Sequence, residues 1–210
     1  AILSYPGAML SAVFGLSEML GICNKICAEQ GRPEYFVLHQ LAPDALATPT
    51  QFYQAIILPP CIEGDYYLKP DALVLQWLKQ SHSNGSLLCS ACAGAFILAS
   101  TGLMQQRQMT THWDLAELFK KQHPKVTLQI EKNLINDGDI LSSGGLMAWV
   151  DLGLELQHYA QALSANAMAS FCFLTERTFY DVLSKLQALN LHFTCNDYAF
   201  KKPANYWSSL

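Results

Sequence analysis

Short apolar runs alternate with longer stretches of helical periodicity, and this alternation restricts the fold more than any other feature of the chain. We expect strands near 1–5, 35–41, 55–58, 86–90, 108–111 and 126–130, and helices near 10–29, 71–80, 93–100, 114–121 and 147–162. An Asn-Asp-Gly-Asp sequence within 133–142 predicts a tight turn between two extended arms. Strands that alternate with helices predict an α/β fold, a three-layer sandwich with a mostly parallel sheet.

The end of the chain follows a different pattern. Residues 168–189 predict one long helix or two, and beyond Leu191 the periodicity dissolves into aromatic and polar residues. We therefore divide the chain into an α/β domain, 1–163, and a C-terminal helix and tail, 164–210. The tail is expected to pack on the domain or to link it to another one.

The composition fits a domain with a sizeable core and excludes DNA binding by this segment alone. Of 210 residues, 51% are hydrophobic and 14% are charged. The net charge is −4, and Lys and Arg form nothing larger than pairs such as Lys120–Lys121. Proteins that neutralise DNA phosphates carry a basic stripe, which this pattern does not provide.

The cysteines and the apolar runs predict a cytoplasmic protein without membrane contact. No uninterrupted apolar run reaches the length of a membrane span, and no signal-peptide pattern is present. Seven cysteines in a chain with an ample core are expected to be mostly reduced thiols. Cys23 and Cys27 share a helix face, yet no second ligand pair lies nearby, so we predict core packing and no metal or cofactor.

The segment SLLCSACAGAFILASTG, 86–102, places Cys92 where a strand turns into a helix. Its neighbours are all small: Ser90, Ala91, Ala93 and Gly94. Ligands of parallel sheets bind at the carboxyl ends of the strands, and hydrolases hold their nucleophile on such a sharp turn. The following helix is expected to lower the pKa of Cys92. The alternative is a buried, purely structural thiol like Cys89.

The sequence from this turn onward, CAGAFILASTGLMQQRQMTTHW at 92–113, resembles the ThiJ/PfpI family of the class I glutamine amidotransferase-like superfamily. The branch it resembles most forms the amino-terminal domain of AraC-type transcriptional regulators. SYPGAMLSAVFGLSEML and NDGDILSSGGLMAWVDLGLEL resemble the family's first strand and helix and its later hairpin and helix. The resemblance implies a flavodoxin-like fold with a cysteine nucleophile elbow.

The resemblance also implies a reactive site. Cys92 would be its thiolate, His112 would pair with the thiol or line its pocket, and Glu18 would stand at the family's acidic position. A buried Glu18 would stay protonated and donate a hydrogen bond to the sulfur. The ligand-binding candidates are Cys61, Ala93, Gly94, Ser143 and Gly144.

The chain departs from the family at LPPC, residues 58–61, where the family usually carries a Pro-Gly-Gly turn. Pro60 has no N–H, and Cys61 lacks the backbone freedom of glycine, which weakens an oxyanion hole. Losing one oxyanion donor typically costs ~10²–10³ in rate. The change also suggests a redox sensor, since Cys61 could pair with Cys92 on oxidation.

Three functions remain open at this point. The first is a ligand- or redox-sensing domain of an AraC-type regulator, which forms a homodimer and binds a small-molecule effector. Its DNA-binding helix-turn-helix domain would follow Leu210 and is missing from this chain. The alternative is a cysteine-dependent enzyme using Cys92, such as an amidase, an isonitrile hydratase or a glyoxalase-like enzyme. The third is a stand-alone oxidative-stress protein with neither role.

Overall fold

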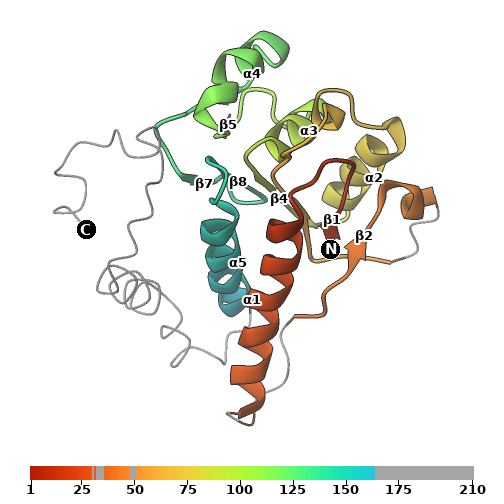
Figure 1. Ribbon diagram of the computed structural model, residues 1–210, viewed down its shortest axis with the longest axis vertical. Coiled ribbons are helices and arrows are strands. Elements are labelled where there is room, and N and C mark those ends of the chain that lie inside the picture. The colour runs from red at the N-terminus through yellow and green to blue at the C-terminus, as the bar shows by residue number, and fades with distance from the viewer. Residues whose placement is uncertain (30, 32–35, 48–50, 164–210) are drawn as a thin grey trace, which may run out of the picture. The chain divides into compact units, whose positions relative to one another are not determined.

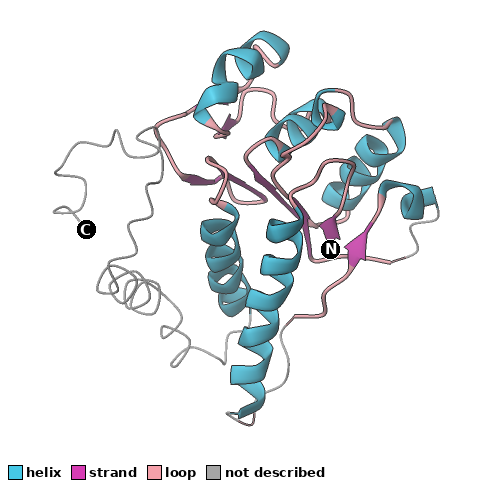
Figure 2. Ribbon diagram, viewed as in Figure 1, coloured by secondary structure: helices cyan, strands magenta, loops and turns pink. Residues whose placement is uncertain are grey.

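The computed structural model describes residues 1–29, 31, 36–47 and 51–163 (Figure 1). The predicted C-terminal helix and tail, 164–210, lie outside the described residues. Figure 2 shows helices on the two sides of a central sheet, which confirms the predicted α/β sandwich.

The central sheet has six strands in the order β2-β1-β3-β4-β8-β7. Their bounds are β1 Ile2–Leu3, β2 Gln40–Leu41, β3 Ala55–Leu58, β4 Leu87–Ala91, β7 Leu134–Asn136 and β8 Ile140–Ser143. Every pair is parallel except β7 and β8, which form the predicted hairpin. β4 lies inside the sheet, and all of its residues are buried, as expected for a strand covered on both faces.

Helices cover both faces of this sheet. α1 (Leu10–Glu29) packs against α5 (Trp149–Leu163), and α2 (Ala72–Ser83) packs against α3 (Gly94–Ser100) (Figure 1). The remaining helical elements are the 3-10 turns η1 Pro43–Ala47, η2 Tyr66–Leu68 and η3 Trp113–Leu115, and the helix α4 Ala116–Gln122.

Two predicted strands do not join the central sheet. The segments expected near 108–111 and 126–130 contain β5 (Gln108–Met109) and β6 (Thr127–Leu128), which pair in parallel as a separate two-stranded sheet. The hairpin explains the difference, because β8 takes the place beside β4 and β7 then forms the edge. Sequence periodicity indicates strands but does not say which strands pair.

α1 and α5 interlock through two glycines. A Cβ on Gly15 would lie 2.5 Å from the Trp149 ring, and a Cβ on Gly153 would lie 1.8 Å from the Met19 methyl group. Each glycine therefore leaves the space that a large side chain of the other helix fills. This close approach places the helical layer directly against β4 and β8.

α1 corrects the expectation about membrane spans. By length and composition alone this 20-residue helix could cross a membrane. In the structure its inward positions are buried in the domain: Ala12, Val13, Leu16, Leu20, Cys23 and Cys27. The core helix of a soluble protein passes the same test, so α1 is weak evidence for a span, and the expected absence of membrane contact stays a prediction.

A polar cluster ties the β7–β8 turn to two other segments. Arg107 donates from Nε to Asp137 Oδ2 at 2.5 Å and from Nη2 to Asp139, while His82 Nε2 lies 2.7 Å from the other Asp139 oxygen. Hydrogen bonds from Arg107 chiefly, and from His82, lower the pKa of Asp139 to about 2. The cluster joins the end of α2, the entry to β5 and the hairpin.

We expect Asp139→Asn to lower the free energy of unfolding at pH 7 by about 0.5–1 kcal/mol, a modest loss because the side chain is half exposed. Since the folded pKa lies below the ordinary value of 3.8, the contribution is complete above pH 4 and is lost as the pH falls towards 2. Urea unfolding of both proteins between pH 7 and pH 2.5 measures this convergence. Glu117→Gln, at an exposed pair with Lys120, is the control and should change little. An equal gap at every pH would contradict the expectation.

Candidate functional site

Cys92 forms the sharp turn between β4 and α3 that the sequence predicts. Its φ is +53°, a left-handed backbone that costs a non-glycine residue roughly 1–3 kcal/mol. Two neighbours hold it there: the Cys92 N–H donates to Ser143 O at 2.9 Å, and the Thr111 hydroxyl donates to Cys92 O at 2.7 Å. The surrounding structure thus imposes the conformation of a nucleophile elbow.

Close backbone packing requires a glycine at position 94, two residues after Cys92. A Cβ on Gly94 would lie 2.4 Å from Leu58 O and 2.9 Å from Pro59 O. The start of α3 therefore rests on the end of β3, and Ala93, beside it, is buried. Ala93 and Gly94, predicted as ligand-binding residues, are located at the elbow as backbone framework.

Ser143 and Gly144 complete this framework from the end of β8. Ser143 contributes the carbonyl that binds the Cys92 N–H, and its hydroxyl lies 3.4 Å from Ser90 O. Gly144 donates its N–H to Asn133 O at 2.7 Å, and a Cβ on it would lie 3.0 Å from Thr111 O. Both predicted residues thus border the elbow through their backbones.

The sulfur of Cys92 is buried, with 4% of the residue exposed, and this corrects the expectation of a lowered pKa. Burial raises the pKa of Cys92 to about 11, and the Ala93 N–H, which points at the sulfur, offsets only part of this effect. Loss of hydration therefore outweighs the favourable field of a short helix. At neutral pH Cys92 is a thiol.

Aromatic side chains and a second thiol surround the elbow. Tyr5 is 3% exposed, donates its hydroxyl to Pro59 O at 2.6 Å and stacks on Tyr66 at a centroid distance of 5.5 Å. Burial raises the pKa of Tyr5 well above its usual range, and Cys61 and Cys92 both add to the shift. Burial also raises the pKa of Tyr67, again with contributions from both thiols. The two phenols and the two thiols are thus electrostatic neighbours.

Cys61 lies in the loop that follows β3, where it contacts the loop after β1. Its thiol donates to Glu63 O at 3.1 Å, and its backbone forms an isolated antiparallel bridge with Ala8. A Cβ on Gly7, whose φ is +79°, would lie 1.8 Å from Glu63 O and 3.0 Å from the Cys61 sulfur. Glycine is needed at this crossing of the two loops. Burial raises the pKa of Cys61 as well.

The structure does not assemble Cys92, His112 and Glu18 into one hydrogen-bonded group. His112 caps η3, with Nδ1 accepting from the Asp114 N–H at 3.2 Å, and its ring lies beside Trp113. Burial lowers the pKa of His112, so the imidazole is neutral at neutral pH with its proton on Nε2.

Glu18 is a correction to the predicted site. It is exposed on α1, and the buried positions of that helix carry no carboxyl group. The predicted hydrogen bond from Glu18 to the sulfur is therefore not formed. Helical periodicity places position 18 between two faces, so that the pattern alone did not decide which way it points.

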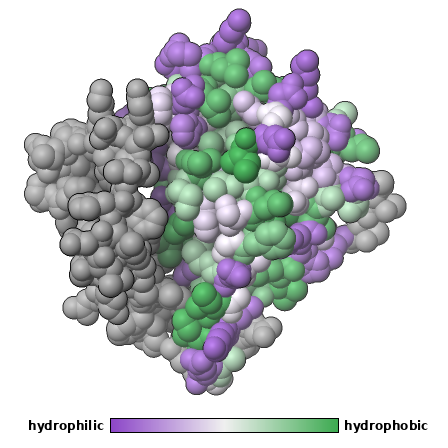
Figure 3. Space-filling view, viewed as in Figure 1, coloured by the Kyte–Doolittle hydropathy of each residue, from purple (hydrophilic) through white to green (hydrophobic). Residues whose placement is uncertain are grey.

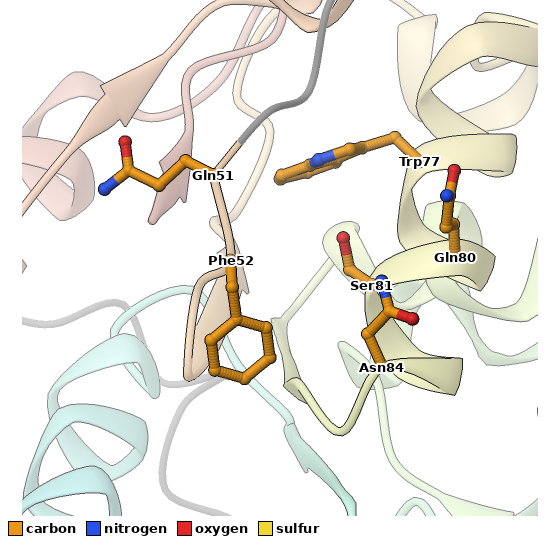
Figure 4. Close-up of a pocket in the computed structure, with 6 residues that line it drawn as sticks. All are labelled: Gln51, Phe52, Trp77, Gln80, Ser81 and Asn84. Atoms are coloured by element: carbon orange, nitrogen blue, oxygen red, sulfur yellow. The ribbon is translucent and has the colours of Figure 1, made fainter.

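A shallow hollow lies at the opposite edge of the sheet from Cys92. Figure 4 shows Gln51 and Phe52 on the segment that enters β3, and the Trp77 ring extending from α2 towards this segment. Its lining residues are Gln51, Phe52, Trp77, Gln80, Ser81 and Asn84. These positions precede β3 and β4, whereas ligands of parallel sheets bind beyond the carboxyl ends. The hollow is therefore separate from the elbow.

Sequence reasoning missed Tyr5, Tyr67 and Thr111. Tyr5 ends the predicted first strand, immediately before a Pro-Gly turn, and the carboxyl ends of parallel strands meet at one edge. That signal could have placed Tyr5 beside Cys92. Tyr67 lies in the short turn η2, for which periodicity gives no position. Thr111 ends the strand expected near 108–111, but the partner of its hydroxyl depends on a contact between distant segments.

The model of the DJ-1/PfpI family matches residues 31–158 of the chain. The HTH-type transcriptional regulator CdhR of Pseudomonas aeruginosa is 34% identical over 83 residues, which are 40% of this chain and 24% of the regulator. The isonitrile hydratase of Pseudomonas putida is 26% identical over 100 residues, 46% of this chain and 42% of the enzyme. The chain thus spans less than half the length of either relative.

A crystal structure with a similar fold is that of an AraC family transcriptional regulator from Pseudomonas putida, with a TM-score of 0.55 and 14% identity. The similarity covers 76% of this chain and 89% of that one. At this identity the likeness shows the fold alone, and it agrees with the flavodoxin-like arrangement described above.

We expect Gly94→Ala to lower the free energy of unfolding by ~1–3 kcal/mol, because the added methyl would meet Leu58 O and force α3 away from β3. Gly21→Ala is the matched control: no heavy atom lies within 4 Å of its Cβ, and alanine in a helix stabilises by ~0.5–1 kcal/mol. Urea unfolding of the three proteins measures the two opposite shifts. Wild-type stability in Gly94→Ala would show that the contact between α3 and β3 is not tight.

Proposed function

Because the chain belongs to the DJ-1/PfpI family, we propose that it is the sensing domain of an AraC-type transcriptional regulator. Its 34% identity over 83 residues with an HTH-type transcriptional regulator supports this proposal. The chain covers 24% of that regulator's length, so DNA binding would belong to another domain. The net charge of −4 agrees with this division of labour.

The observation that carries the proposal is the state of Cys92. Its pKa of about 11 keeps the sulfur protonated at neutral pH. A cysteine nucleophile needs a lowered pKa or an adjacent base, and among the described residues neither His112 nor a carboxyl group hydrogen-bonds to this thiol. Pro59 and Pro60 also remove two N–H groups beside the elbow. Such a site suits binding better than turnover.

We infer that the effector is a small, uncharged molecule bound over Cys92. The groups around the elbow are neutral at neutral pH: the pKa values of Cys61 and Tyr67 are raised, and that of His112 is lowered. A neutral site offers no counter-charge to an anion, whereas thiol, phenol and imidazole groups can hydrogen-bond to a carbonyl or a similar dipole.

A cysteine-dependent enzyme is the second candidate. The elbow itself favours it, since Cys92 keeps a strained backbone that a purely structural residue would not need. The 26% identity with an isonitrile hydratase points to the same chemistry. This candidate would require a base to reach Cys92 once substrate is bound.

We further propose a cytoplasmic homodimer. No disulfide joins the five described cysteines, as expected in a reducing compartment. Hydrophobic side chains reach the surface along α1 (Figure 3), where Leu10, Phe14 and Ile22 are each at least half exposed. A second copy that covers this row would remove it from water.

If the site senses rather than catalyses, wild-type protein and Cys92→Ala should hydrate an alkyl isonitrile and hydrolyse a small amide at the same background rate. Alkylation of Cys92 by iodoacetamide should be slow at pH 7 and keep rising beyond pH 9, because the thiolate forms around pH 11. Cys27→Ala, at a buried thiol on α1, is the control and should preserve this profile. Turnover that disappears in Cys92→Ala, or alkylation that levels off below pH 8, would favour the enzyme.

The regulator itself is tested by reading the gene past the codon for Leu210. We expect a basic domain with helix-turn-helix patterns there. A stop codon at that point would contradict a DNA-binding domain on that side. The sensing domain would then need another explanation.

For the homodimer, we expect Phe14→Ser to shift the protein from dimer to monomer in sedimentation velocity at micromolar concentration. Phe14 is 53% exposed at the centre of the row on α1. Leu73→Ser, at a residue 56% exposed on α2, should leave the dimer intact. A wild-type protein that sediments as a monomer would disprove the proposal.

A further inference from the structure

We propose that a hydroperoxide oxidises Cys61 and Cys92 to an intramolecular disulfide, and that this bond switches the loop over the effector site. The inference rests on the proposed sensing function only for its biological purpose. The bond itself is a property of two thiols in this chain. In the structure both are free, so the proposal concerns a second state of the same loop.

The two cysteines follow neighbouring parallel strands. Leu58 pairs with Ser90 in the register of β3 and β4, so Cys61 and Cys92 lie three and two residues beyond the same rung. Adjacent strands are ~4.8 Å apart. Beyond this rung the chains stay close, since Gly94 abuts Leu58 O and Pro59 O. The topology thus brings both thiols to one edge of the sheet.

The buried Tyr5 phenol lies beside both thiols, which marks their common location. Its hydroxyl is anchored on Pro59 O, between β3 and Cys61. A disulfide needs Cα atoms about 4.4–6.8 Å apart, and the Cys61 thiol is turned towards Glu63 O. Forming the bond therefore requires the loop 59–65 to release that hydrogen bond and turn Cys61 towards the elbow.

The difference in burial assigns the order of the reaction. Cys61 is half-buried, whereas Cys92 is 4% exposed, so a hydroperoxide meets Cys61 first. Its sulfur attacks the peroxide O–O bond and becomes a sulfenic acid, while the alcohol or water leaves. The Cys92 sulfur then attacks the Cys61 sulfur, the S–O bond breaks, and water leaves. The two thiols together give two electrons and two protons to the peroxide.

The bond would change the loop contacts that the reduced state holds. Cys61 forms the bridge with Ala8, and Ile62 donates its N–H to Gly7 O at 3.0 Å. Moving Cys61 towards Cys92 breaks these contacts between the two loops and places the Cys61 sulfur over the elbow. An effector that needs access to Cys92 would therefore bind the reduced protein and not the oxidised one.

The experiment treats reduced wild-type protein with one equivalent of hydrogen peroxide, blocks the remaining thiols with N-ethylmaleimide and measures intact mass and sequenced peptides. We expect loss of two hydrogens, two fewer maleimides, and a crosslink between the peptides of Cys61 and Cys92 that dithiothreitol reverses. Cys61→Ala and Cys92→Ala should each abolish it. Cys27→Ala and Cys89→Ala, at thiols that are also buried, should retain it.

The resolving step gives a further readout. Because the pKa of Cys92 is about 11, conversion of the Cys61 sulfenic acid, once formed, to the disulfide should accelerate about tenfold for each pH unit between pH 7 and pH 9. Addition of two oxygens to Cys92 with Cys61 still reduced would overturn the proposal, and so would a crosslink to another cysteine. Peptides from the wild type decide this even if a variant fails to fold. This inference and the proposed function can fail separately. The disulfide could form in a protein that has no DNA-binding domain, and a protein with such a domain could fail to form the disulfide.

Discussion

The left-handed backbone of Cys92 is the constraint on which the site depends. A side chain at this turn is held by neighbours that cannot move independently, since Ser143 belongs to β8 and Thr111 leads into η3. The strand order places β8 beside β4, so the hairpin that displaces β5 and β6 from the sheet also delivers the carbonyl that fixes the elbow. The conformation of the site therefore depends on the strand order. With another strand order, Cys92 would lose these contacts and could leave its left-handed backbone conformation.

Burial decides the chemistry of the elbow against the usual expectation for such a turn. A helix start and an aimed N–H group favour a thiolate, yet removal of water from the sulfur opposes it more strongly, and the neighbouring thiol adds to the opposition. The same loss of hydration keeps Tyr5 and Cys61 in their neutral forms. The edge of the sheet is consequently a region of dipoles without formal charge, which separates it from the hydrolytic sites that share its backbone geometry.

Much of the fold could be predicted because the apolar residues that face the core recur along the sequence at the spacing of a helix or a strand. The bounds predicted for the helix 10–29 and the strand 55–58 are those of α1 and β3, and the turn around Gly138 forms as its residues require. Pairing is different, because no local pattern distinguishes a strand of the central sheet from β5 or β6. The same limit applies to the site: the position of Cys92 follows from strand and helix signals, whereas the outward direction of Glu18 and the packing of Tyr5 on Pro59 depend on contacts between distant segments.

The interlock of α1 and α5 determines how movement at the elbow would travel. A ring seated over Gly15 and a methyl group seated over Gly153 block sliding along the helix axes, so the pair shifts as one rigid layer. α5 begins shortly after Ser143 and ends at Leu163, where the chain continues. A small rotation at the elbow would therefore arrive at the end of α5 as a displacement enlarged by the length of the helix, in the manner of a lever arm.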